Sequence, residues 1–163
     1  MAEGDKYEGF SLALAVVDGV PVLAFGASCV ILGMLFRSPL FIAGSCLCFL
    51  AGFLKVLWKV LLAVSKKDIS LLNRQFRCLM PAGFGIIILS LVLGAEKISI
   101  PGIISAATAF PSVIFFALWI CGMAAMGALA KRLDSSDVKS NWIEQGVNGA
   151  AQLCLLAGLL FLL

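Results

Sequence analysis

Long apolar runs separated by short polar segments dominate this chain. The runs end at about Phe36, extend over about Leu40 to Val64 and Leu79 to Ala95, end again near Leu129, and extend from Asn141 to Leu163. About 20 apolar residues in a helix cross the hydrocarbon core of a bilayer. The runs therefore predict an all-α, polytopic integral membrane protein with five transmembrane helices.

The composition agrees with this class and excludes several kinds of site. The sequence is 62% hydrophobic and 13% charged, and one helical membrane domain accounts for residues 1–163. It has no histidine, which excludes His-ligated haem, His-containing zinc sites and His-based catalysis. None of the six cysteines forms a C-x-x-C pair, so they are expected to be packing residues. We expect no cofactor, no bound metal and no nucleic acid, and membrane lipids as partners.

The basic residues predict the orientation of the helices. One side of a five-helix protein would hold Lys6, Lys66, Lys67, Arg74, Arg77, Lys131, Arg132 and Lys139, and the other side Arg37 and Lys97. The positive-inside rule then places the N-terminus in the cytoplasm and the C-terminus outside. The acidic segment Met1–Glu8 is unlike the basic leader of a signal peptide. The expected location is the cytoplasmic membrane of a bacterium.

The segment between the second and third runs has a helical pattern of its own. Within Asp68 to Leu79, apolar residues recur at helical spacing at Ile69, Leu72, Phe76 and Leu79, and Asp68 is placed to cap the start. This pattern predicts a short interfacial amphipathic helix on the inner membrane surface. The alternative is a basic connector that only sets the topology.

Two runs are longer than a bilayer requires. Phe10–Val17 precedes the 20 or so residues that end at Phe36, and Asp18, Gly19 and Pro21 mark the expected break. Ile98–Ala109 precedes the fourth span, with the break at Pro111. Each surplus piece is expected either to lie in the interface or to fold into the protein as a half-helix.

The last run has two distinct faces. At about 100° per residue, one face holds Asn141, Glu144, Gln145, Asn148 and Gln152, and the opposite face holds Gly146, Ala150, Cys154 and Gly158. Unpaired polar groups are costly in lipid, so the helix is expected to lie between a polar interior and a close helix neighbour. A second small-residue stripe, Gly44-x-x-x-Cys48-x-x-x-Gly52, also favours close packing.

Structural explanations compete with this polar interior. Asn141 and Glu144 have the spacing of a capping box. Asn148 and Gln152 are equally consistent with hydrogen bonds that hold helices together. The close neighbour of the small face belongs either to the same chain or to a second copy, and we expect a homo-oligomer.

Two lysines lie inside the second run. Lys59 is roughly 8 Å from the inner end of its helix and can extend to the headgroups. Lys55 is roughly 13 Å deep, where a lysine costs about 2.5 to 3.5 kcal/mol without a partner. We therefore predict that Lys55 is buried and paired with Asp18 or Glu144.

These features favour a small membrane transporter or channel. It would move a small polar solute or ion through a polar pocket between helices one, two, four and five. The expected binding residues are Asp18, Lys55, Glu144, Asn148 and Gln152. The alternative is a non-catalytic accessory or ligand-binding subunit of a membrane complex. An intramembrane enzyme ranks last, because histidine and a clustered acidic metal motif are lacking.

Overall fold

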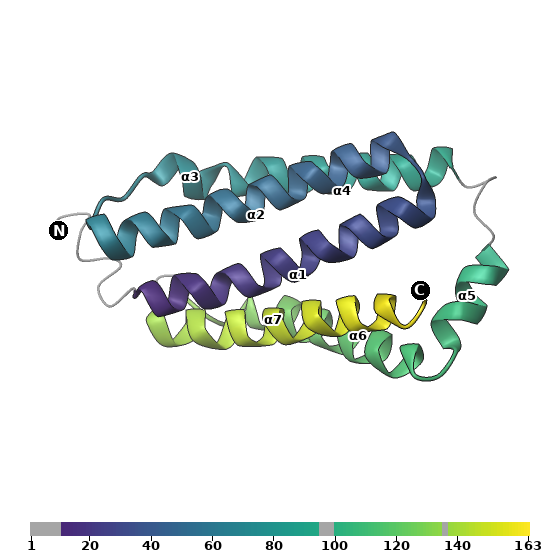
Figure 1. Ribbon diagram of the computed structural model, residues 1–163. Helices are drawn as coiled ribbons and strands as arrows, with labels where there is room; N and C mark the ends of the chain where they lie inside the picture. The colour runs from purple at the N-terminus through teal and green to yellow at the C-terminus, as the bar shows by residue number, and fades with distance from the viewer. Residues whose placement is uncertain (1–10, 95–99, 135–136) are drawn as a thin grey trace.

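The computed structural model describes residues 11–94, 100–134 and 137–163, and every secondary-structure element within these ranges is an α-helix (Figure 1). The helices are α1 (Leu12–Phe36), α2 (Pro39–Ser65), α3 (Ser70–Arg74), α4 (Phe76–Leu93), α5 (Ile100–Thr108), α6 (Ser112–Leu129) and α7 (Val138–Leu160). The predictions made for Met1–Glu8, for Phe10 and for Lys97 and Ile98 concern residues outside the described ones.

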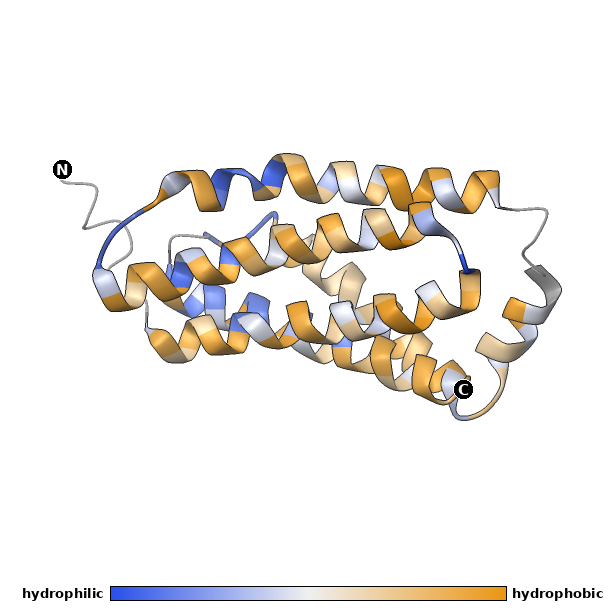
Figure 2. Ribbon diagram, turned by 45° about the horizontal axis from the view of Figure 1, so that its top comes forward, coloured by the Kyte–Doolittle hydropathy of each residue, from blue (hydrophilic) through white to orange (hydrophobic). Residues whose placement is uncertain are grey.

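Among the described residues, four helical segments are long and apolar enough to cross a membrane, which indicates an integral membrane protein. They are α1, α2, the combined segment Ser70–Leu93, and α6. Most of the length of these helices is coloured as hydrophobic in Figure 2. The predicted fifth span corresponds to α7, which has 23 residues but is more polar in its first half. Its membrane crossing therefore remains a proposal.

The long helices form a row in which each packs on the next. α4 packs against α2, α2 against α1, α1 against α7, and α7 against α6. Figure 1 shows that long helices consecutive in the chain run in opposite directions, whereas α1 and α7, which are neighbours in the row, run in the same direction. The start of α1, the end of α2 and the start of α7 therefore meet at one end of the bundle. Buried Leu14, Trp58 and Leu62 form the apolar core at that end. This arrangement brings polar residues from three helices together.

Only one of the two predicted helix breaks occurs. The break at Pro111 is confirmed, because α5 ends at Thr108 and α6 begins at Ser112. The predicted break at Asp18, Gly19 and Pro21 is wrong, because α1 continues through all three residues. Its start is fixed by Ser11, whose hydroxyl accepts a hydrogen bond from the backbone N–H of Leu14 at 3.3 Å. Proline is tolerated inside membrane helices when neighbours satisfy the freed backbone groups, and a long helix fits the bilayer by tilting.

The predicted amphipathic helix is shorter than expected and joins the third span. α3 covers only Ser70–Arg74, and Phe76 already belongs to α4. Asp68 does not cap α3. Its carboxylate instead accepts a hydrogen bond from Trp58 Nε1 at 2.7 Å. Gln75 Nε2 donates to the Ala51 carbonyl at 3.0 Å, which ties the junction of α3 and α4 to α2. The position of α3 at the membrane surface stays a prediction.

Small residues set the closest helix contacts, as predicted for α2. A Cβ atom at Gly44 would lie 2.7 Å from the Gly83 carbonyl oxygen, and one at Gly83 would lie 2.5 Å from Cys48 Sγ. Gly52, the third member of the stripe, faces α1, where the nearest Val22 methyl would be 3.0 Å away. The stripe thus lets α2 approach both of its neighbours.

Candidate functional site: a polar cluster between α1, α2 and α7

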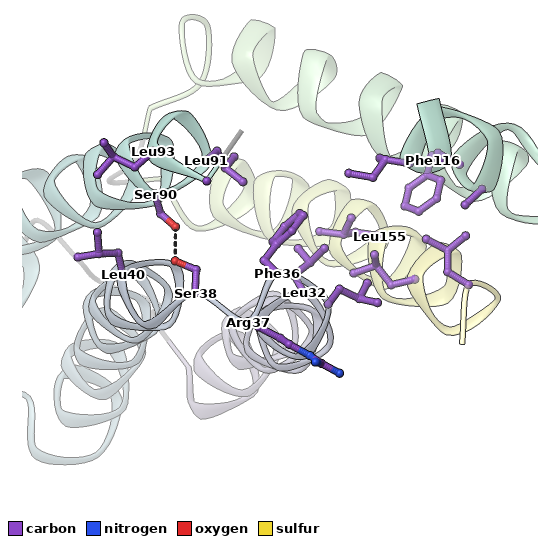
Figure 3. A pocket seen from close by; sticks show the side chains of 18 of the residues that line it. Leu32, Phe36, Arg37, Ser38, Leu40, Ser90, Leu91, Leu93, Phe116 and Leu155 are labelled. Carbon is purple, nitrogen blue, oxygen red and sulfur yellow. Dashed lines mark hydrogen bonds between the residues drawn. The ribbon is translucent and has the colours of Figure 1, made fainter. Parts of the chain in front are cut away.

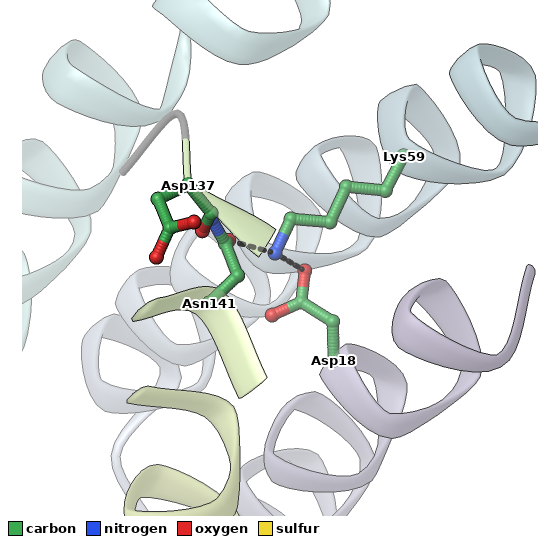
Figure 4. Close-up of polar contacts among 4 residues, drawn as sticks. All are labelled: Asp18, Lys59, Asp137 and Asn141. Atoms are coloured by element: carbon green, nitrogen blue, oxygen red, sulfur yellow. Dashed lines mark hydrogen bonds and ion pairs between the residues drawn. The ribbon is translucent and has the colours of Figure 1, made fainter. Parts of the chain in front are cut away.

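A buried ion pair lies where α1, α2 and α7 meet. Lys59 Nζ is 3.1 Å from Asp18 Oδ2 and donates a hydrogen bond to Asn141 Oδ1, also at 3.1 Å (Figure 4). The Lys59 side chain is 2% exposed, and Asp18 and Asn141 are 5% and 4% exposed. The cluster therefore balances one positive and one negative charge away from solvent.

The start of α7 positions Asn141. Asp137 is the N-cap residue, and its carboxylate accepts hydrogen bonds from the Ser140 backbone N–H and hydroxyl, both at 2.8 Å. Asn141 Nδ2 donates to the Asp137 carbonyl at 3.0 Å, which turns its Oδ1 toward Lys59. The proposed capping box at Asn141 and Glu144 is therefore wrong, because α7 begins one turn earlier and Asn141 lies inside it.

The prediction for the two lysines is reversed. Lys55 is only half-buried, its Nζ lies 4.6 Å from the centre of the Phe76 ring, and it pairs with neither Asp18 nor Glu144 in the described part of the chain. Lys59, which was expected to extend to the headgroups, is the buried and paired lysine. A cation over an aromatic face is favourable, and it explains how Lys55 is accommodated.

The polar face of α7 continues from this cluster into the bundle. Gln145 and Gln152 are 6% and 9% exposed, whereas Glu144 and Asn148 are half-buried. Gln152 Nε2 contacts Met123 Sδ at 3.5 Å. The Oε1 atoms of Gln145 and Gln152 are buried and have no hydrogen-bond partner among the residues that the structure describes. Buried acceptors without partners are costly in proteins, so these two positions are candidate ligand contacts.

The small-residue face of α7 is only partly packed within the chain. Gly158 lies against Phe116 of α6, where an added Cβ would be 3.0 Å from the ring. Gly146 and Ala150 are exposed, and no atom of the described residues lies within 4 Å of a Cβ built at Gly146. Instead, α6 approaches α7 at Ala151. A Cβ atom added at Gly122 of α6 would lie 2.7 Å from the Ala151 Cβ. Packing of Gly146 and Ala150 against a second copy stays a prediction.

Of the five predicted site residues, the structure brings Asp18 into the cluster and leaves Lys55 beside Phe76. Lys59 and Asn141 were not among the expected binding residues, although Asn141 belonged to the predicted polar face of the last run. Two cavities, of about 710 and 780 Å³, lie elsewhere in the bundle, and none of the five predicted residues lines either one. Within the described residues, no group of three or more Cys, Asp or Glu side chains is arranged to hold a metal ion.

Comparisons of the chain with protein-family models, with curated proteins and with solved structures gave no match.

The cap of α7 predicts an acid-sensitive step. The hydrogen bond from the Ser140 hydroxyl, and then that from its backbone N–H, lower the pKa of Asp137 below its ordinary value. The carboxylate therefore stabilises α7 above the unfolded-state pKa, and this contribution is lost as the pH falls through the lower folded-state pKa. Hydrogen exchange of the first turn of α7 should accelerate relative to that of the α2 interior as the pH is lowered from about 5 to about 2.

Two substitutions separate the charge of this cap from its hydrogen bonds. Asp137→Asn keeps an acceptor for the Ser140 N–H and should remove most of the pH dependence. Asp137→Ala should leave the first turn frayed at every pH. Equal pH dependence in the wild type and in Asp137→Asn would contradict a role for the carboxylate.

Proposed function

We propose that this protein is a small membrane transporter or channel that moves a small polar solute or ion along the polar face of α7, with α7 as its fifth membrane span. The observation that most supports this proposal is the buried cluster of Asp18, Lys59 and Asn141. A buried ion pair is weak evidence for stability, because desolvation offsets its attraction. Ionisable residues inside a membrane bundle are a functional-site hypothesis by default.

The arrangement suggests a mechanism for the inner end of the pathway. Asp18, Lys59 and Asn141 join three helices and would close this end while they remain paired. A polar or charged solute that competes for Lys59 or Asp18 would separate α1 from α2 and α7. Gln145 and Gln152, about two helical turns apart, would supply carboxamide contacts further along.

The orientation follows from the charge asymmetry and belongs to the same proposal. With the N-terminus in the cytoplasm, the cluster lies in the inner half of the membrane, and the C-terminus lies outside. A homo-oligomer would cover the outward faces of α4 and α6, which bury few of their side chains within one chain.

Thiol accessibility tests whether the polar face of α7 is hydrated, without requiring the solute to be known. In a background without the native cysteines, Gln145→Cys and Gln152→Cys should react with a charged thiosulfonate at least about tenfold faster than Leu153→Cys, because the reactive thiolate forms where water solvates it. Leu153 is the matched control, since it is 49% exposed on the outer surface of the same helix. The measurement is the labelling rate in native membranes.

A second function is favoured by one specific observation. Lys59 already bonds Asp18 and Asn141, and Gln152 contacts Met123, so much of the polar face bonds within the chain. An accessory subunit would need only such bonds between its own helices. Labelling of Gln145→Cys and Gln152→Cys at the slow rate of Leu153→Cys would contradict the transport proposal and favour the accessory role.

A further inference from the structure

A cavity of about 710 Å³ lies at the end of the bundle opposite the ion pair (Figure 3). It is formed where the ends of α1, α4 and α7 meet the beginnings of α2 and α6, with α5 alongside. Most of its lining is apolar, including Leu32, Phe36, Leu91, Phe116 and Leu155. Its volume lies within the range of about 300 to 1,000 Å³ that small-molecule sites occupy.

Ser38, Ser90 and Arg37 bring polar side chains to this cavity near the connection between α1 and α2. Ser38 and Ser90 share a hydrogen bond of 2.7 Å between their hydroxyl oxygens. Arg37 caps the end of α1 with a left-handed backbone, φ 48°, and its exposed side chain extends outward in Figure 3. Of the described residues that line the cavity, Arg37 is the charged one, so the rim carries a positive charge.

We infer that this cavity holds an acyl chain of an anionic phospholipid, with the lipid phosphate near Arg37. The apolar walls suit a hydrocarbon chain and would leave the polar groups of a hydrophilic solute unpaired. A guanidinium binds phosphate through two parallel hydrogen bonds. The N-terminus of α2, which begins after Ser38, adds the partial positive charge of the helix dipole beside it. This site is independent of the transport proposal.

The second cavity offers an internal comparison. It has about 780 Å³ and lies between α1 and α2, lined by residues such as Leu23, Gly26, Val30, Ile42 and Phe49. None of its described lining residues is charged. It would accept a chain of any lipid, whereas the cavity at Arg37 is expected to select the headgroup.

Quenching of Trp119 tests this inference, because Trp119 lines the cavity at Arg37. Trp58→Phe with Trp142→Phe leaves Trp119 as the single tryptophan. In vesicles, phosphatidylglycerol with brominated acyl chains should quench it with about fivefold higher apparent affinity than brominated phosphatidylcholine, the effect of one basic residue near an anionic headgroup. If the double substitution fails to fold, the difference in fluorescence quenching between the wild type and Trp119→Phe gives the quenching of Trp119.

Three variants decide the outcome. Arg37→Gln should abolish the preference for phosphatidylglycerol, and Ala107→Phe, which fills part of the cavity, should reduce quenching by both lipids. Arg132→Gln, which removes an exposed charge after α6 at the other end of the bundle, should leave the preference unchanged. Equal quenching by the two lipids, or a preference that survives Arg37→Gln, overturns the inference. So does stronger quenching by a brominated free fatty acid in neutral vesicles, which would assign the cavity to that ligand.

Discussion

Replacement of Lys59 by methionine should lower the free energy of unfolding by about 3 to 5 kcal/mol, the usual cost of removing one partner from a buried ion pair. The substitution leaves the Asp18 carboxylate, which is 5% exposed, without its cation, and it removes the hydrogen bond from Lys59 to Asn141 Oδ1. Methionine keeps most of the apolar length of the lysine side chain, so the loss reports on charge rather than on volume. Equilibrium unfolding of the purified protein in mixed micelles, followed by circular dichroism, measures the change.

The chain supplies a matched control one helical turn away. Lys55→Met should cost only about 1 kcal/mol, because it removes a half-buried cation from the face of the Phe76 ring. Asp18→Asn combined with Lys59→Met should recover much of the loss, since no unpaired charge then remains. Equal losses at Lys55 and Lys59, or no recovery in the double variant, would contradict the ion pair as the structure describes it.

The long-range architecture was largely predictable because it depends on the lengths of apolar runs. α1, α2 and α6 end within a residue or so of the expected positions, and the boundary at Pro111 follows from the geometry of proline. Pro21 has the same geometry, yet α1 continues through it. Whether a proline ends a membrane helix depends on the neighbours that satisfy the freed backbone groups, and the sequence alone does not specify those neighbours.

The identity of the buried lysine was not predictable from depth. Lys55 and Lys59 differ by about 40° around the helix and by about 6 Å along it. Depth favoured Lys55 as the lysine in need of a partner, but the rotation of α2 between its two neighbours decided the outcome. That rotation places Lys59 toward α1 and α7 and Lys55 beside Phe76. It results from packing among several helices, which a single-helix pattern does not contain.

The role of Asn141 could have been found from the sequence. Asp137 and Ser140 have the spacing of an N-cap residue and the N–H that it binds, and they lie one turn before the expected capping pair Asn141 and Glu144. With α7 starting at Val138, Asn141 becomes an interior residue that faces the same side as Gln145 and Gln152. Asn141, Gln145 and Gln152 of the predicted polar face are therefore buried, and the helix starts one turn earlier than predicted.

Gly83→Ala should destabilise the protein by about 1 to 3 kcal/mol or more, even though alanine favours helices, because it overpacks the contact between α2 and α4. The new Cβ would lie 2.5 Å from Cys48 Sγ and 2.8 Å from the Gly44 carbonyl oxygen. The carbonyl belongs to the backbone of α2, so the two helices must move apart. Unfolding in mixed micelles again measures the effect.

Gly85→Ala is the matched control for this substitution. It lies two residues further along α4, and within the described part of the chain no atom comes within 4 Å of a Cβ built there. It should therefore gain up to about 1 kcal/mol from helix propensity alone. Adding Cys48→Ala to Gly83→Ala removes the sulfur but leaves the Gly44 carbonyl in place, so it should restore only part of the loss. If Gly83→Ala is as stable as Gly85→Ala, α2 and α4 do not approach each other closely at Gly44 and Gly83. The packing of α4 on α2, which helps to fix the rotation that places Lys59, would then be contradicted.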